Sequence, residues 1–115
     1  MEIYFPDAER RQLFCTGNLL RTRFGDGLAE MICSRLQLLK RARSLALVPA
    51  DSPVSLSSDR SKPGLFTVGL DAAHRLLFEA VSDELVPTRC TDPDAIRFIR
   101  ILAVEKNSES EGVEK

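Results

Sequence analysis

The chain has 115 residues, of which 43% are hydrophobic and 29% are charged. This length and composition are typical of one soluble globular domain and exclude wholesale disorder, and no stretch approaches the ~20 apolar residues that a membrane span needs. The net charge of −1 gives no global signal for nucleic-acid binding. Residues 1–62 nevertheless carry ten Lys and Arg against seven Asp and Glu, so a local basic surface is compatible with the sequence.

The chain is expected to begin with a short strand and a helix. Residues 2–5 alternate polar and apolar side chains, which predicts a strand that Pro6 ends. Pro6 and Asp7 then suit a helix start, because proline is tolerated in the first turn and an acid is favoured at the N-terminal dipole. This helix is expected to run to about Cys15, where Thr16–Asn18 break it.

A longer helical pattern follows over residues 18–43. Its apolar stripe consists of Leu28, Met31, Ile32, Leu36 and Leu39. Gly25 and Gly27 mark a break near its start. Its basic residues lie mostly off the apolar stripe: Arg35, Lys40, Arg41 and Arg43.

The second half is predicted to be mainly strands. Residues 54–58 are a candidate edge strand, and a period-two pattern over residues 65–71 and 74–81 predicts an antiparallel hairpin with a short turn. A loop over 82–95 leads to a final strand, 96–105, that is apolar on both faces and therefore suits a central position. Residues 106–115 are expected to be a disordered acidic tail.

This order of elements predicts an α+β fold, in which two N-terminal helices pack on a small antiparallel sheet. The three cysteines, Cys15, Cys33 and Cys90, form no C-x-x-C pair and are expected to be reduced thiols in a cytoplasmic protein. The sequence has no zinc-ligand spacing and no glycine-rich phosphate loop, so we expect neither a metal nor a cofactor.

Residues 57–80, SSDRSKPGLFTVGLDAAHRLLFEA, resemble the hairpin of the HigB-like "killer protein" branch of the RelE/ParE toxins. In that branch a basic loop leads to a strand, a tight turn and an Asn-Tyr-Arg-Leu-Ile-Phe-Glu strand. The segments Arg35–Leu39 and Ala42–Pro49 and the closing strand through Val104 agree in order and spacing. The resemblance covers residues 1–105 and implies a RelE-like fold.

The resemblance implies the toxin of a bacterial toxin–antitoxin system. Many members cleave mRNA on the ribosome without a metal and thereby stop translation and growth, and others inhibit DNA gyrase. The implied partners are a cognate antitoxin, often a helix-turn-helix DNA-binding protein, together with mRNA and the ribosome. The resemblance implies no association with a membrane, and it leaves open whether the protein forms a homodimer.

Three residues are candidates for the chemistry of RNA cleavage. Arg75 matches the family's strand arginine and is predicted to point away from the Leu76 and Phe78 face, where a guanidinium can hold a phosphate. The alternative is a solvated arginine or one paired with Glu79. Lys62 lies where the family carries its basic loop, and His74 offers an imidazole for acid or base work, unless it only packs at the turn.

Further basic residues are candidates for RNA binding: Arg60 in the loop, and Arg35, Lys40, Arg41 and Arg43 on the helix. The alternative for the helical set is an ordinary solvated face. Catalysis predicts that Arg75, Lys62 and Arg60 share one exposed concave face.

Two departures from the family pattern leave a second hypothesis open. Val54–Ser57 replace the family's His-Glu-Leu-Lys, and Lys106–Ser108 replace its closing Asp-Tyr-His. Several proton-transfer groups are therefore missing. The alternative is a non-catalytic or degenerate module of the same fold, or an inhibitor of gyrase.

Overall fold

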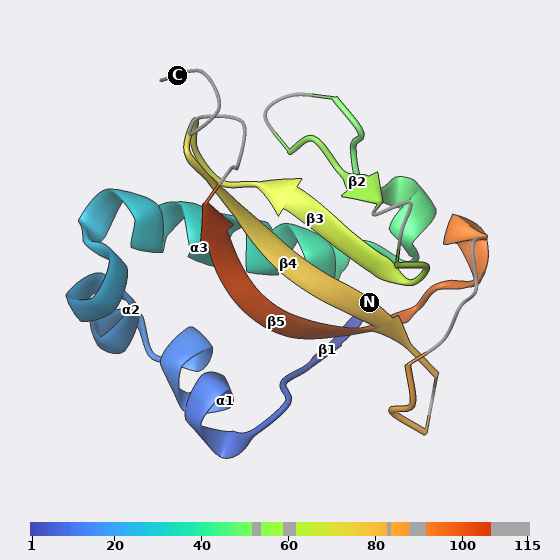
Figure 1. The fold of residues 1–115 in the computed structure, drawn as a ribbon, viewed down its shortest axis with the longest axis horizontal. Helices are drawn as coiled ribbons and strands as arrows, with labels where there is room; N and C mark the ends of the chain where they lie inside the picture. Colours follow the sequence, from blue (N-terminus) through green and yellow to red (C-terminus); the bar gives the residue numbers. More distant parts are fainter. Residues whose placement is uncertain (52–53, 59–61, 83, 88–91, 107–115) are drawn as a thin grey trace.

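The computed structural model describes residues 1–51, 54–58, 62–82, 84–87 and 92–106. Within these residues the elements are β1 (Glu2–Tyr4), α1 (Ala8–Cys15), α2 (Gly17–Phe24), α3 (Asp26–Arg41), η1 (Leu45–Leu47), β2 (Ser57–Ser58), β3 (Leu65–Gly69), β4 (His74–Val81), η2 (Pro93–Ala95) and β5 (Phe98–Lys106). The long helix α3 crosses behind the sheet, and α1 and α2 stand to one side (Figure 1). The predicted α+β class is confirmed.

The described strands form one sheet in the order β1-β5-β4-β3-β2. The neighbours from β2 to β5 are antiparallel, but β1 runs parallel to β5, with Glu2 opposite Phe98 and Tyr4 opposite Arg100. The sheet is therefore mixed, and the expectation of a purely antiparallel sheet is wrong. Strand direction across a long connection depends on tertiary packing, which the local pattern does not contain.

The helices begin and end where local chemistry requires it. Asp7 caps α1 by accepting a hydrogen bond from the backbone N–H of Arg10 at 2.7 Å. Gly25 lies between α2 and α3 at φ +85°, a left-handed conformation that favours glycine. The predicted break in the long helical pattern thus lies at Gly25, whereas Gly27 is inside the first turn of α3.

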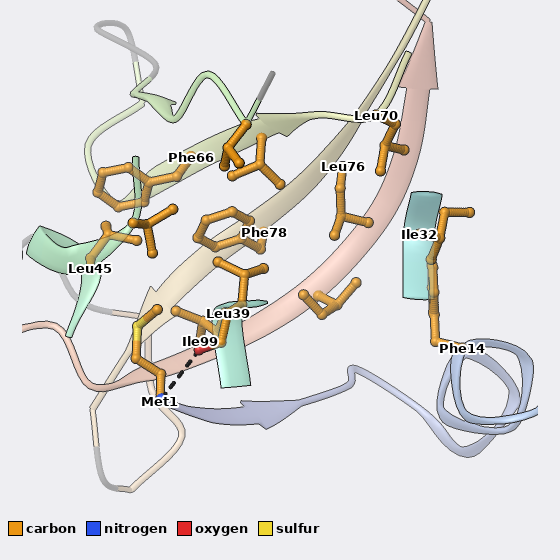
Figure 2. Close-up of a cluster of buried hydrophobic side chains, with 14 of the residues drawn as sticks. Met1, Phe14, Ile32, Leu39, Leu45, Phe66, Leu70, Leu76, Phe78 and Ile99 are labelled. Atoms are coloured by element: carbon orange, nitrogen blue, oxygen red, sulfur yellow. Dashed lines mark hydrogen bonds between the residues drawn. The ribbon is translucent and has the colours of Figure 1, made fainter. Parts of the chain in front are cut away.

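The core lies between α3 and the covered face of the sheet. Phe78 and Leu76 from β4 and Ile99 from β5 are fully buried, and they lie opposite Ile32 and Leu39 of α3 (Figure 2). Burying a side chain of this size contributes about 1.5–3 kcal/mol, so this layer holds helix and sheet together.

The amino group of Met1 joins β1 to the end of α3. It donates hydrogen bonds to the carbonyl oxygens of Leu39, Lys40 and Ala42, the first of which is drawn in Figure 2. Carbonyls at a helix C-terminus lack intrahelical donors, and a cation there also complements the helix dipole. This contact fixes the start of the chain beside the core.

The predicted hairpin is present with a well-defined register. Leu65 lies opposite Glu79 and Gly69 lies opposite Arg75, so β3 and β4 pair along the whole of β3. Alternate residues face the core, and Arg75 lies on the opposite face, as expected. The side of the sheet away from α3 is called the open face below.

Candidate functional site

Arg75 lies on the open face at the start of β4 and is half-exposed. Its Nε donates to Oε1 of Glu105 on the neighbouring strand at 3.2 Å, and both side chains keep more than a third of their surface in water. The register explains this pair, because Arg75 is directly opposite Glu105. Arg75 therefore forms an ion pair, as the alternative interpretation expected, but its partner is Glu105 and not Glu79.

A second cross-strand ion pair lies further along the open face. Nη2 of Arg100 donates to Oε1 of Glu79 at 2.9 Å, and this pair is more buried, at 23% and 15% exposure. Nη1 of Arg100 also lies 3.4 Å from the carbonyl oxygen of Leu85. Each of these two arginines on the open face thus has a carboxylate partner.

A β-bulge in β5 places both ion pairs on one face. Leu77 is opposite Ala103, but Phe78 is opposite Ile101, so Leu102 is an extra residue in β5. The arginine and glutamate of β4 are four residues apart, whereas their partners in β5 are five apart. Without the extra residue, the β5 partners would alternate to opposite faces of the sheet.

His74 and Asp71 form a hydrogen-bonded pair at the turn before β4. Nδ1 of His74 lies 2.9 Å from Oδ1 and 3.2 Å from Oδ2 of Asp71. Oδ1 also accepts from the backbone N–H groups of Ala73 and His74, at 2.8 Å each. The expectation that His74 sits at a turn on the Leu76 side of the strand is met.

The carboxyl group of Asp71 is held in its ionised form. Burial works to raise its pKa, but the hydrogen bonds from Ala73 and His74 and the imidazole beside it outweigh burial and lower the pKa. An ionised carboxylate only accepts hydrogen bonds, so Nδ1 of His74 carries the proton that lies between them. In neutral His74 this leaves Nε2 free of a proton and able to accept one.

Lys62 lies at the other end of the hairpin from Arg75. The backbone carbonyl of Lys62 accepts a hydrogen bond from the N–H of Leu65, the first residue of β3. Leu65 lies opposite Glu79, near the far end of β4 from Arg75. The strand from Leu65 to Gly69 separates this end from Arg75 by about 13 Å at ~3.3 Å per residue. The structure therefore does not bring Lys62 and Arg75 together, and Arg60 lies outside the described residues.

The basic residues of α3 divide into two groups. Arg35 is only 5% exposed, and its Nε donates to the carbonyl oxygen of Gly69 at 2.7 Å, so the expectation that it faces RNA is wrong. Position 35 follows Ile32 by three residues and therefore turns toward the sheet. Lys40, Arg41 and Arg43 are exposed at and after the end of α3.

Lys106 is a cation that the sequence analysis assigned to the tail. Strand β5 continues through Lys106, which is paired with His74 in the register and therefore lies on the same face of the sheet. The alternation of the last strand could have revealed it. We call Asp71, His74, Arg75, Glu105 and Lys106 the strand-end cluster, in which Arg75 and Glu105 lie on the open face and His74 and Lys106 lie on the other face.

The positions that depart from the family pattern have local roles of their own. Val54 is 6% exposed and belongs to the core, and the backbone carbonyl of Val54 accepts from the N–H of Gly69. Ser57 is exposed in the short edge strand β2. Neither residue offers a proton-transfer group to the strand-end cluster.

Among the described residues, no group of three or more His, Cys, Asp or Glu side chains is arranged to hold a metal ion. The helices of this part of the chain are all too short or too polar to cross a bilayer. No protein-family model, curated protein or solved structure matches the chain. The family resemblance therefore stays an expectation.

Proposed function

We propose that this protein is a bacterial toxin of the RelE/ParE type that cleaves mRNA without a metal, and that the strand-end cluster is its reactive site. The observation that supports this proposal is the Asp71–His74 hydrogen bond at the end of the sheet where β4 begins. The carboxylate fixes the imidazole tautomer of His74, and Arg75 is the next residue of β4, so a proton acceptor and a phosphate-binding group lie at the same end of the sheet, on its two faces.

The reaction that these groups support is an internal transfer at phosphorus. Nε2 of His74 takes the proton of a ribose 2′-OH, the oxygen attacks the adjacent phosphorus, and the 5′-oxygen leaves and takes a proton from water. The products are a 2′,3′-cyclic phosphate and a 5′-OH end. Lys106, on the same face as His74, stabilises the charge that develops on the phosphate oxygens, and Arg75 holds a neighbouring phosphate of the RNA from the open face.

Because the Arg75–Glu105 pair is solvent-exposed, a phosphate can replace Glu105 at little cost, since exposed ion pairs contribute about 0–1 kcal/mol. Lys40, Arg41 and Arg43 lie away from this cluster, and in this proposal they hold flanking RNA or ribosomal RNA. The proposed partners are an antitoxin, mRNA and the ribosome in the cytoplasm.

The test is induction of the chain in bacteria, followed by growth curves and mRNA mapping. We expect growth arrest with loss of mRNA. Arg75→Ala and His74→Ala should abolish both effects, and Arg97→Ala, which changes an exposed arginine outside the cluster, should abolish neither. Cleavage by the purified protein should continue in EDTA and should leave cyclic phosphate ends.

A non-catalytic module of the same fold is the second candidate. The separation of Lys62 from Arg75 and the carboxylate partner of Arg75 favour it, because fewer free cations converge on one phosphate. Growth arrest with intact mRNA would support this candidate and a protein target such as gyrase. Absence of arrest would indicate a degenerate copy.

A further inference from the structure

The two cysteines among the described residues line the same cavity, although they come from different helices. Cys15 is the last residue of α1 and is exposed, whereas Cys33 lies in the middle of α3 and is half-buried. Both are free thiols. The cavity has a volume of about 680 Å³ and lies between β1, the end of α1 and one face of α3.

The face of α3 that carries Cys33 turns toward β1 and the end of α1. Three residues that follow Cys33 at helical spacing line the same cavity: Leu36, Gln37 and Lys40. Cys33 also lines a second cavity, of about 290 Å³, together with Gly17, the first residue of α2. Cys33 therefore lies opposite the junction of α1 and α2, with Cys15 on one side of it and Gly17 on the other.

The end of α1 is held in place by an aromatic contact with the residue that follows β1. The rings of Phe5 and Phe14 stack with their centroids 5.8 Å apart, and Phe14 is only 5% exposed. Cys15 comes directly after Phe14 and is followed by Thr16, which is extended at φ −118° and ψ 108° between the two helices. Helix ends fray more readily than helix centres. The side chain of Cys15 can therefore move within the cavity, while Phe14 keeps the junction against the core.

We propose that Cys15 and Cys33 form a thiol pair that a peroxide oxidises to a reversible disulfide. Redox-sensitive cysteines are accessible to solvent and commonly have a second, resolving cysteine close by. Cys15 is the accessible thiol and reacts first, and Cys33 is the half-buried thiol that resolves the intermediate. The bond joins the α1–α2 junction to α3. This site does not depend on the proposed RNA chemistry.

The oxidation takes place in two steps. The sulfur of Cys15 attacks one oxygen of hydrogen peroxide, the O–O bond breaks, and Cys15 becomes a sulfenic acid while its thiol proton leaves with the other oxygen as water. The sulfur of Cys33 then attacks the sulfur of Cys15, the S–O bond breaks, and a second water leaves with the proton of Cys33. Two thiols thus give up two electrons, and one peroxide is reduced to two waters.

The experiment treats the reduced full-length protein with one equivalent of hydrogen peroxide and maps disulfides by mass spectrometry of peptides prepared without a reductant. We expect a pair of peptides joined through Cys15 and Cys33, and dithiothreitol should restore both thiols. Cys33→Ser should stop the reaction at the sulfenic acid of Cys15, which dimedone traps. Cys15→Ser should abolish both the joined peptides and the early labelling by dimedone.

Two controls test whether the folded cavity selects this pair. Cys90→Ser removes the cysteine that lies outside the described residues, and it should leave the yield of joined peptides unchanged. The double variant Cys33→Ser with Ser34→Cys keeps the number of thiols and moves one of them by about 100° around α3, to an exposed position. Because Ser34 does not line the cavity with Cys15, this variant should form no bond to Cys15.

Four results would overturn the proposal. Oxidation of both thiols to sulfinic acids without joined peptides would show that the two sulfur atoms do not meet. A dimer joined through two Cys15 residues, or a bond from Cys15 to Cys90, as the main product would give Cys15 another partner. Equal yields from the parent and the double variant, or equal rates in the folded protein and in urea, would show that the folded cavity does not select the pair.

Discussion

The Nε of Arg35, in the middle of α3, donates a hydrogen bond of 2.7 Å to the carbonyl oxygen of Gly69, at the end of β3. This buried contact joins helix and sheet over 34 residues of sequence, and it lies just before the turn that carries Asp71 and His74. A guanidinium buried in this way stabilises the fold and supports the turn, and it is not a surface for RNA.

The first prediction concerns this contact. Arg35→Ala should lower the free energy of unfolding by about 2–4 kcal/mol, because it removes a charged hydrogen bond to a carbonyl and leaves a cavity. Arg35→Met keeps most of the aliphatic stem and should cost less. Urea unfolding of the three proteins checks the order, and equal stability of Arg35→Ala and the parent would contradict the role of this contact.

The second prediction separates two glycines that look alike in the sequence. Neither Gly25 nor Gly27 has an atom within 4 Å of an added Cβ, but only Gly25 has a positive φ, +85°. Gly25→Ala should therefore destabilise the protein by about 1–2 kcal/mol. Gly27→Ala should stabilise it by about 0.5–1 kcal/mol, because it lies in helix α3. Thermal unfolding should show shifts of opposite sign.

The third prediction compares the two ion pairs of the open face. The pair of Arg100 and Glu79 is shielded from water, so Glu79→Gln should cost about 1–3 kcal/mol. The pair of Arg75 and Glu105 is exposed, and Glu105→Gln should cost about 0–1 kcal/mol. Unfolding at low and high salt tests this, and the Glu105 variant should lose most of its difference from the parent in high salt.

The fourth prediction is a pH dependence at the turn. The folded pKa of Asp71 lies below its ordinary value of 3.8, so the folded state binds fewer protons there than the unfolded state. Its contribution to stability is therefore fully present above the unfolded pKa and is lost as the pH falls through the folded pKa. Asp71→Asn keeps an acceptor for the turn and removes this change.

Urea midpoints measured from neutral pH into the acid range check the fourth prediction. The parent should be more stable than Asp71→Asn above the unfolded pKa, and the difference should shrink in more acidic solution. A difference that stays constant down to strongly acidic pH would show that the charge of Asp71 contributes nothing.

Local sequence chemistry was sufficient for the hairpin and for where the helical segments lie, although three helices form where two were predicted. Pro6 and Asp7 determine where α1 begins, Gly25 breaks the long helical pattern, and alternation places Arg75 on the open face. These features depend on backbone dihedrals, caps and period, which involve residues only a few positions apart. The same reasoning could have extended β5 to Lys106.

Only the tertiary structure decided which distant residues meet. The parallel position of β1, the burial of Arg35 and the separation of Lys62 from Arg75 depend on strand order and register. Such contacts join residues far apart in the chain, and no local period or composition encodes their pairing. The bulge at Leu102 is the clearest case, because one extra residue decides which carboxylate each arginine meets.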